Sequence, residues 1–376
     1  MQAKPALVTN LLCLSLLAAC GIKQASPSTP IRARILSSQD GVYSLRDVNF
    51  STLVNVEHMQ GSLGTILGHA SASVDADPSE IIAASNPDGL YRKRGQTVHL
   101  DYIVKNGTVI PQSFASMEML GLYYNFERTV MFWQEQLGLD FTSIGLPRLF
   151  YNPSLSRSKN GQEEKISEVM NAAYLSGIKD LWFYQTSPRE KIPVKMNFGI
   201  VAHEFGHYIF DYAFAKFEPA AYETNLLSNS ELLSGMNEGI ADFFSYMVAG
   251  NAKEFAKSLP ELEAERSLPV SWTLSTLRSA ACEGGHYCRG SILASALYEI
   301  SQSPGQSAIA VGKNVLANLP YFQHRWESEA MDELVDESLL LTPLLTSEGV
   351  DKSLYCKVFL KWFDTKSLQS NLPCNT

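Results

Sequence analysis

The sequence predicts an α+β fold in which a β-rich N-terminal part precedes a mostly helical C-terminal part. Residues 31–111 carry short alternating apolar runs broken by Gly, Asn, Asp and Pro, a pattern typical of strands and turns. Beyond residue 196, apolar residues recur at helical spacing almost to the end of the chain. The chain has 376 residues, 45% of them hydrophobic and 18% charged, which is the composition of a well-packed globular protein.

The pattern changes twice between these two parts. Residues 116–137 are expected to form a long buried helix that ends at Gly138. Residues 140–195 alternate apolar runs with Pro, Ser and Lys, and we expect a small sheet there. The helices expected after this sheet cover residues 196–213, 230–249, 289–302, 305–317, 328–341 and 351–364.

The charge balance narrows the classes of partner. The formal net charge is −9, which argues against nucleic acid as the main partner because nucleic acid recruits faces rich in Lys and Arg. After the N-terminus there is no run of 18 or more apolar residues, so a polytopic membrane protein is excluded.

The N-terminus has the features of an export signal. Residues 1–19 carry Lys4, then an apolar run and small residues ahead of Cys20. This segment resembles the signal peptide and lipobox of bacterial lipoproteins, which implies cleavage before Cys20, acylation of that cysteine, and a lipid-anchored protein in the cell envelope. Residues 20–30 suit a tether. Gly21 favours the outer membrane if the host has two membranes, and an ordinary signal peptide with an incidental cysteine is the alternative.

Four further cysteines follow, and an even number in an exported chain suggests disulfides. Sequence proximity favours Cys282 with Cys288, and Cys356 with Cys374, among the three connectivities. A zinc site built from these cysteines is disfavoured because no CxxC pair is present.

The strongest chemical signal is the sequence His203-Glu-Phe-Gly-His207 within an apolar helical context. Positions i and i+4 share one helix face, so both imidazoles can reach one tetrahedral zinc ion. Glu204 lies beside them and can take a proton from a metal-bound water without being a ligand. Two surface histidines on a helix are the alternative, which the apolar flanks weaken.

A second pair of residues supplies carboxylates. Glu238 and Asp242 are again i and i+4 in a helix-like segment, so one can ligate the metal while the other accepts from an imidazole N–H. A solvated acidic face is the alternative, but the segment is mostly apolar, and an unpaired charge is costly there.

Together these motifs resemble the gluzincin zinc metalloproteases, and most closely the thermolysin-like (neutral metalloprotease) family. The resemblance covers roughly residues 116–363 and implies a zinc-dependent peptidase with that family's fold, its active-site helix lying between a β-rich and a mostly helical part. It implies His203, His207 and Glu238 as ligands of one zinc ion, Glu204 as the general base and Asp242 behind a ligand histidine.

Weaker matches suggest further site residues. Gly284-Gly285-His286 is similar to the family's Gly-Gly-x-His segment, with one residue fewer before the histidine, which implies that His286 is an oxyanion donor. The sequence around Arg278 resembles the family's Leu-Arg-Ser, whose arginine binds the substrate carbonyl and supports the aspartate behind the ligand histidine, here Asp242. Asn171 and Ala172 resemble the edge-strand pair that binds the substrate backbone. An inconsequential loop histidine and an ordinary ion-pair arginine are the alternatives.

The chain also departs from the family. The acidic, Gly-rich calcium loops are missing, so calcium is not expected. No motif identifies the counterpart of the family's catalytic tyrosine, for which Tyr222 is a candidate. Cys282 stands where an acidic residue would orient the histidine, a role that Glu283 could take.

The sequence therefore predicts a lipid-anchored zinc endopeptidase that acts on peptides or proteins as a monomer. The alternatives are a catalytically inactive zinc-site lipoprotein with a binding or envelope-assembly role, and a metal-dependent hydrolase of other substrates. The expected parts are a signal peptide, a tether, a β-rich region, a catalytic subdomain with the zinc helix and a helical catalytic subdomain, in residues 1–19, 20–30, 31–115, 116–230 and 231–376.

Overall fold

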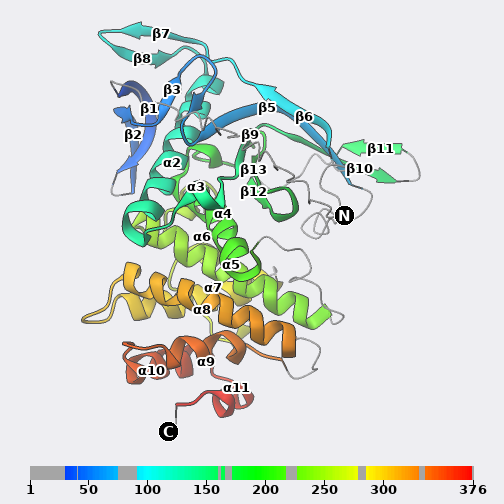
Figure 1. The fold of residues 1–376 in the computed structure, drawn as a ribbon, viewed down its shortest axis with the longest axis vertical. Helices are drawn as coiled ribbons and strands as arrows, with labels where there is room; N and C mark the ends of the chain where they lie inside the picture. The colour runs from blue at the N-terminus through cyan, green and yellow to red at the C-terminus, as the bar shows by residue number, and fades with distance from the viewer. Residues whose placement is uncertain are drawn as a thin grey trace, which may run out of the picture.

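The structure is a computed structural model. It describes residues 30–39, 41–74, 91–159, 162–165, 172–216, 227–277, 285–329 and 335–374. The strands gather in the N-terminal half of the chain and helices make up the C-terminal half, so the predicted α+β arrangement is confirmed (Figure 1). Among the described residues, none of the helices combines the length and the apolar character that crossing a membrane requires.

The first sheet has the strand order β2-β1-β8-β7. β1 and β8 run parallel, and the other two pairings are antiparallel. Ala33 and Ile35 alternate along β1 with exposed residues and are fully buried, so one face of this sheet contributes to the core. The strands are β1 (Ile31–Gln39), β2 (Val42–Phe50), β7 (Tyr102–Lys105) and β8 (Thr108–Pro111).

The second sheet follows the path β11-β10-β5-β9-β13-β12, with β3, β4 and β6 beside it. β12 pairs antiparallel with β13 and ends the path within the described residues, so it is an edge strand. The strands are β3 (Leu53–Asn55), β4 (Gln60–Gly61), β5 (Gly64–Val74), β6 (Tyr91–Thr97), β9 (Arg148–Tyr151), β10 (Ser154–Lys159), β11 (Gln162–Lys165), β12 (Ala172–Leu175) and β13 (Asp180–Phe183).

The expected small sheet in residues 140–195 is therefore part of a larger one. β5 from the N-terminal region pairs in parallel with both β9 and β10. Parallel strands need a long connection, here one that includes a helix, so the pairing is non-local and local alternation could not reveal it.

The long helix expected in residues 116–137 is α2 (Phe114–Leu137). Ser113 caps its start by accepting from the Ser116 N–H, and Gly138 ends it in the left-handed conformation with φ 73°. Its inner face is buried throughout, and Trp133 packs edge-on against Phe244 with the ring centroids 4.9 Å apart.

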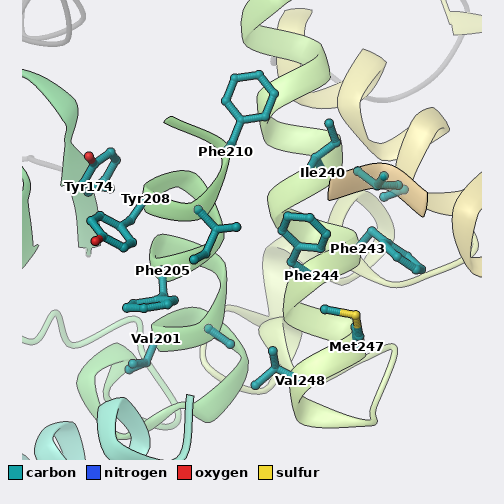
Figure 2. Close-up of a cluster of buried hydrophobic side chains, with 14 of the residues drawn as sticks. Tyr174, Val201, Phe205, Tyr208, Phe210, Ile240, Phe243, Phe244, Met247 and Val248 are labelled. Carbon is teal, nitrogen blue, oxygen red and sulfur yellow. The ribbon is translucent and has the colours of Figure 1, made fainter. Parts of the chain in front are cut away.

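Two helices form the centre of the molecule, α4 (Phe198–Phe210) and α5 (Leu227–Ala249). Figure 2 shows the two lying side by side with their apolar side chains between and around them. Asn197 caps α4 by accepting from the Ile200 N–H. Several of these side chains are fully buried, namely Val201, Phe205, Ile240, Phe243 and Phe244.

The remaining helices lie mostly below this pair in Figure 1. They are α3 (Phe141–Ile144), α6 (Glu263–Arg266), α7 (Gly285–Ser301), α8 (Ala308–Glu329), α9 (Ser338–Thr346), α10 (Lys352–Trp362) and α11 (Lys366–Asn371). A disulfide between Cys356 and Cys374 ties α10 to the segment after α11.

Two helix boundaries were wrongly predicted. The helix expected to end at residue 317 continues to Glu329 despite Pro320, and the helix expected from residue 328 begins only at Ser338. Val315, Leu319, Phe322 and Trp326 continue one buried stripe across the proline, so tertiary packing outweighs the local helix breaker.

Candidate metal centre

The two histidines of the sequence motif lie one turn apart on α4 and face the same point. The Nε2 atoms of His203 and His207 are 3.0 Å apart. His203 is buried, and His207 is half-buried. The apolar residues around them fix the rotation of α4 against the core, so both imidazoles turn toward α5.

Glu238 on α5 completes a three-ligand group. Its Oε2 lies 3.5 Å from His203 Nε2, and its Oε1 lies 3.7 Å from His207 Nε2. Ligand atoms around a tetrahedral zinc ion, with bonds of about 2.0 to 2.1 Å, lie about 3.3 Å apart. The three observed separations bracket that value, so this donor set fits zinc without large rearrangement.

A close helix crossing fixes the position of Glu238. Gly290 of α7 lies against the turn of α5 that carries Glu238, and a Cβ added at Gly290 would be 2.9 Å from the Glu238 Cβ. Gly239 meets the Gly290 carbonyl in the same way. This crossing leaves room for no larger residue, and it places the first turn of α7 beside the metal centre.

Each histidine is oriented through its other ring nitrogen. His203 Nδ1 lies 3.0 Å from Asp242 Oδ1, and His207 Nδ1 lies 2.9 Å from Asn237 Oδ1. With Nδ1 facing these oxygens, each Nε2 is left to ligate a metal. Asp242 was predicted to take this position behind a ligand histidine. Asn237 was not predicted, although it is the residue directly before the predicted ligand Glu238.

The metal centre contains more carboxylates than permanently charged bases, and this excess of negative charge shifts the pKa values of its residues. Burial alone would lower the pKa of His203, but Asp242 and Glu238 outweigh it and raise the pKa to about 10. Burial would raise the pKa of Glu238, but His207, His203 and Arg266 hold it well below its usual range. The centre therefore favours an added positive charge, either a proton or a metal ion.

Glu204 occupies the position of a general base. It is only 7% exposed, and burial raises the pKa of its carboxyl group although the neighbouring histidines oppose this. The Tyr174 backbone N–H also bonds to the carboxylate. Tyr174 belongs to β12, so the base lies beside the edge strand of the second sheet.

Arg266 at the end of α6 is a site residue that the sequence analysis missed. Its Nη1 lies 2.9 Å from Asp242 Oδ2 and 3.3 Å from Glu238 Oε2, with the side chain 9% exposed. Arg278, which was expected to support Asp242, lies outside the described residues. Both arginines precede a serine, but Glu265 stands before Arg266 where the Leu-Arg-Ser pattern has leucine.

Tyr287 in the first turn of α7 is a second missed residue. The Arg266 guanidinium lies 4.7 Å from the centre of its ring, and the nearby carboxylates of Glu238 and Glu204 add to burial in raising the pKa of its phenol. Among the described residues no hydrogen-bond partner is seen for this phenol. Counted without a gap from Gly284 and Gly285, the Gly-Gly-x-His spacing falls on Tyr287 rather than His286.

The structure describes only some of the other predicted site residues. His286 is the second residue of α7 and is half-buried, with its ring centre 4.2 Å from that of Tyr287. Ala172 is the first residue of β12 and is 7% exposed. Cys288 is disulfide-bonded to a cysteine outside the described residues. The predicted residues Cys20, Asn171 and Cys282, and the guesses Tyr222 and Glu283, also lie outside them.

Comparison with solved structures gives a remote likeness. No protein-family model and no curated protein matches the chain. Among solved structures, the chain is similar to the precursor of protealysin, a metalloproteinase from Serratia proteamaculans, with 13% sequence identity and a TM-score of 0.43. The match covers 78% of this chain and 86% of that one. Because the likeness is remote, the functional argument rests on the geometry of the metal centre.

Proposed function

We propose that the protein is a zinc-dependent endopeptidase that hydrolyses peptide bonds and is anchored to a bacterial membrane by lipid on Cys20. The observation that carries the enzymatic proposal is the convergence of His203, His207 and Glu238 on one point, with the Glu204 carboxylate beside it. The anchor, the export and the monomeric state are proposed from the sequence alone.

Zinc held by these three ligands would polarise and acidify a water molecule in its open fourth position. Glu204 would accept a proton from the attacking water and later pass it to the leaving amine. Burial supports this role, because a raised pKa brings the carboxylate closer to the basicity that such a transfer needs near neutral pH.

The edge strand supports a peptide substrate. β12 has one side without a strand partner among the described residues, and Tyr174 links it to Glu204. An extended peptide can pair with such an edge through backbone hydrogen bonds. Ala172 at the start of β12, together with Asn171 before it in the sequence, would hold the substrate backbone.

Tyr287 and Arg266 are the groups best placed to assist charge development. The phenol of Tyr287 has an O–H to donate, and Arg266 keeps its ring beside the metal centre through their contact. We therefore assign the oxyanion donor role to Tyr287, with His286 and Arg278 as the other donors that the sequence suggests. A bridge between Cys282 and Cys288 would hold the turn that carries Tyr287.

The decisive experiment is cleavage of a mixed peptide library by the zinc-loaded chain, with and without a zinc chelator. Glu204→Gln should retain zinc, measured by elemental analysis, but lose cleavage. Glu231→Gln, on the exposed face of α5, is the matched control and should cleave like the wild type.

Absence of cleavage by a folded, zinc-loaded wild type would reject the peptidase proposal and favour the inactive zinc-site lipoprotein. Cleavage that survives both the chelator and Glu204→Gln would reject the assigned site.

Tyr287→Phe tests the donor assignment. Loss of one oxyanion donor typically lowers kcat by about 10²- to 10³-fold, and we expect a fall of that order with little change in KM. Tyr298→Phe removes the same hydroxyl three turns along α7 and should leave kcat unchanged. A fall in kcat for His286→Ala but not for Tyr287→Phe would return the role to His286.

A further inference from the structure

A second site lies away from the metal centre, in a cavity of about 770 Å³ between the first sheet and the helices. Its walls come from the β1–β2 hairpin, from α2, from the start of α4 and from the end of α5. This volume is within the range of sites that hold small molecules. None of the residues assigned to the peptidase reaction lines it.

Two arginines line the cavity without a carboxylate partner. The Arg128 guanidinium stacks on the Phe198 ring, 3.7 Å from its centre, and lies 5.5 Å from the centre of the Tyr124 ring. It makes no hydrogen bond or ion pair with the described residues. Arg46 donates from Nε to Ser44 Oγ at 2.8 Å and from Nη1 to the Gln39 amide oxygen, both of which are neutral acceptors.

The acids near these arginines are already engaged. Asp47 lines the cavity, but Arg32 and Arg34 bond to it at 3.0 and 2.7 Å. Glu254 is close enough to interact electrostatically with Arg128, but its oxygens accept from Tyr43 and Asn251 at 2.8 and 3.0 Å. The neutral donors leave the charge of Glu254 in place. The four arginines in and beside the cavity still outnumber these two carboxylates, so the cavity keeps an excess of positive charge in a chain whose net charge is −9.

Burial makes this excess costly. Loss of water around the guanidinium lowers the pKa of Arg128, and the surrounding acids do not fully compensate. A guanidinium stacked on an aromatic ring keeps its N–H groups free in its own plane, where they can bond to carboxylate or phosphate oxygens. The lining also offers Ser37, Ser38 and Asn251 to a polar ligand.

We propose that this cavity binds a small oxyanion, a carboxylate or a phosphate, between Arg128 and Arg46. Such a ligand would supply the missing negative charge and would connect the first sheet to α4 and α5, the two helices that carry the metal ligands. The proposal does not depend on peptidase activity.

The test is isothermal titration of inorganic phosphate, and separately of acetate, into the full-length zinc-loaded chain at ionic strength held constant with sodium chloride. The wild type should bind one equivalent. Arg128→Gln should weaken binding by about tenfold or more, the loss expected for a hydrogen bond to a charged group. Arg189→Gln removes an exposed positive charge outside the cavity and should bind like the wild type.

Arg128→Lys keeps the charge without the planar fork and should bind with intermediate affinity, which guards against a folding defect in Arg128→Gln. Tighter phosphate binding would identify a dianion as the preferred ligand, and tighter acetate binding a carboxylate. Absence of binding at millimolar anion, or equal binding by the wild type and both Arg128 variants, would overturn the proposal.

Discussion

Two clusters of buried charge in this protein, a lysine cluster and the metal centre, are built differently. In the lysine cluster, Lys195 donates to Glu118 at 3.2 Å and to Thr186 at 2.9 Å, while Tyr151 donates to the other Glu118 oxygen at 2.7 Å. A second carboxylate near Lys195, that of Glu190, accepts from the backbone N–H groups of Ser187 and Val194 at 2.6 and 2.8 Å. Both oxygens of Glu118 and both oxygens of Glu190 therefore have donors. Nothing in that arrangement calls for a ligand.

At the metal centre the balance is different. Asp242, Glu238 and Glu204 face one permanently charged base, Arg266, and the two imidazole Nε2 atoms converge instead of pointing to separate partners. The comparison shows that buried charge alone does not mark a functional site. The feature that marks the metal centre is the convergence of several metal-ligating atoms on one point.

The lysine cluster can be broken by Lys195→Met, for which we expect the largest loss of stability. Removing one partner of a buried pair leaves the other charge uncompensated, at a cost of about 3 to 5 kcal/mol. Urea unfolding with and without zinc should give the same loss, because this cluster has no part in metal binding. Adding Glu118→Gln to the same chain should recover part of the loss, and a zinc-dependent loss would contradict the separation of the two clusters.

Arg266→Met makes the corresponding break at the metal centre. In the metal-free chain we expect a loss of about 3 to 5 kcal/mol, because Asp242 and Glu238 lose their buried cation. Zinc carries two positive charges and should offset much of this loss. It should not offset the loss caused by Lys195→Met, because zinc does not bind near Lys195. An equal loss in the presence and absence of zinc would mean that Arg266 is structural in the same sense as Lys195.

The contrast between the two clusters also explains what the sequence could predict. His203, His207, Glu238 and Asp242 were found because each pair follows helical spacing, which is a local property. The division into a β-rich and a helical part was found for the same reason. Both predictions depend only on residues a few positions apart.

Arg266 and Tyr287 could not be found in that way. Their contact depends on α6 and α7 meeting α5, and the close approach at Gly290 that brings α7 to α5 is a tertiary feature. The sequence did not predict the pairing of β5 with β9 or the continuation of α8 through Pro320, and the physical reason is the same. Local secondary-structure propensity is overruled where the burial of apolar surface between segments distant in the sequence contributes more to the free energy of folding.

The disulfide between Cys356 and Cys374 provides a control for the comparison of the two clusters, because it belongs to neither of them. Its separation of 18 residues predicts a stabilisation of about 3 kcal/mol from restricting the unfolded chain. The double variant with both cysteines changed to alanine should lose that amount in urea unfolding. The added stability from zinc should be unchanged, and any change would show that α10 and α11 are coupled to the metal centre.

The smallest expected effect is a difference in pH dependence between the clusters of the metal-free chain. Asp242 and Glu238 raise the pKa of His203 to about 10 from 6.5 against the effect of burial, so its stabilising contribution is full below about pH 6.5 and is lost as pH rises through about 10. Burial lowers the pKa of Lys195 below 10.5, although Glu118 opposes this effect. As pH rises, the folded state therefore releases this proton before the unfolded state does, and the contribution of Lys195 to stability increases toward pH 10.5. Urea unfolding in chelator should show that the stability difference between wild type and His203→Gln shrinks as pH rises, while the difference from Lys195→Met grows. If the His203 difference stays constant with pH, the imidazole is not charged in the metal-free protein, and the acidic excess is balanced in another way.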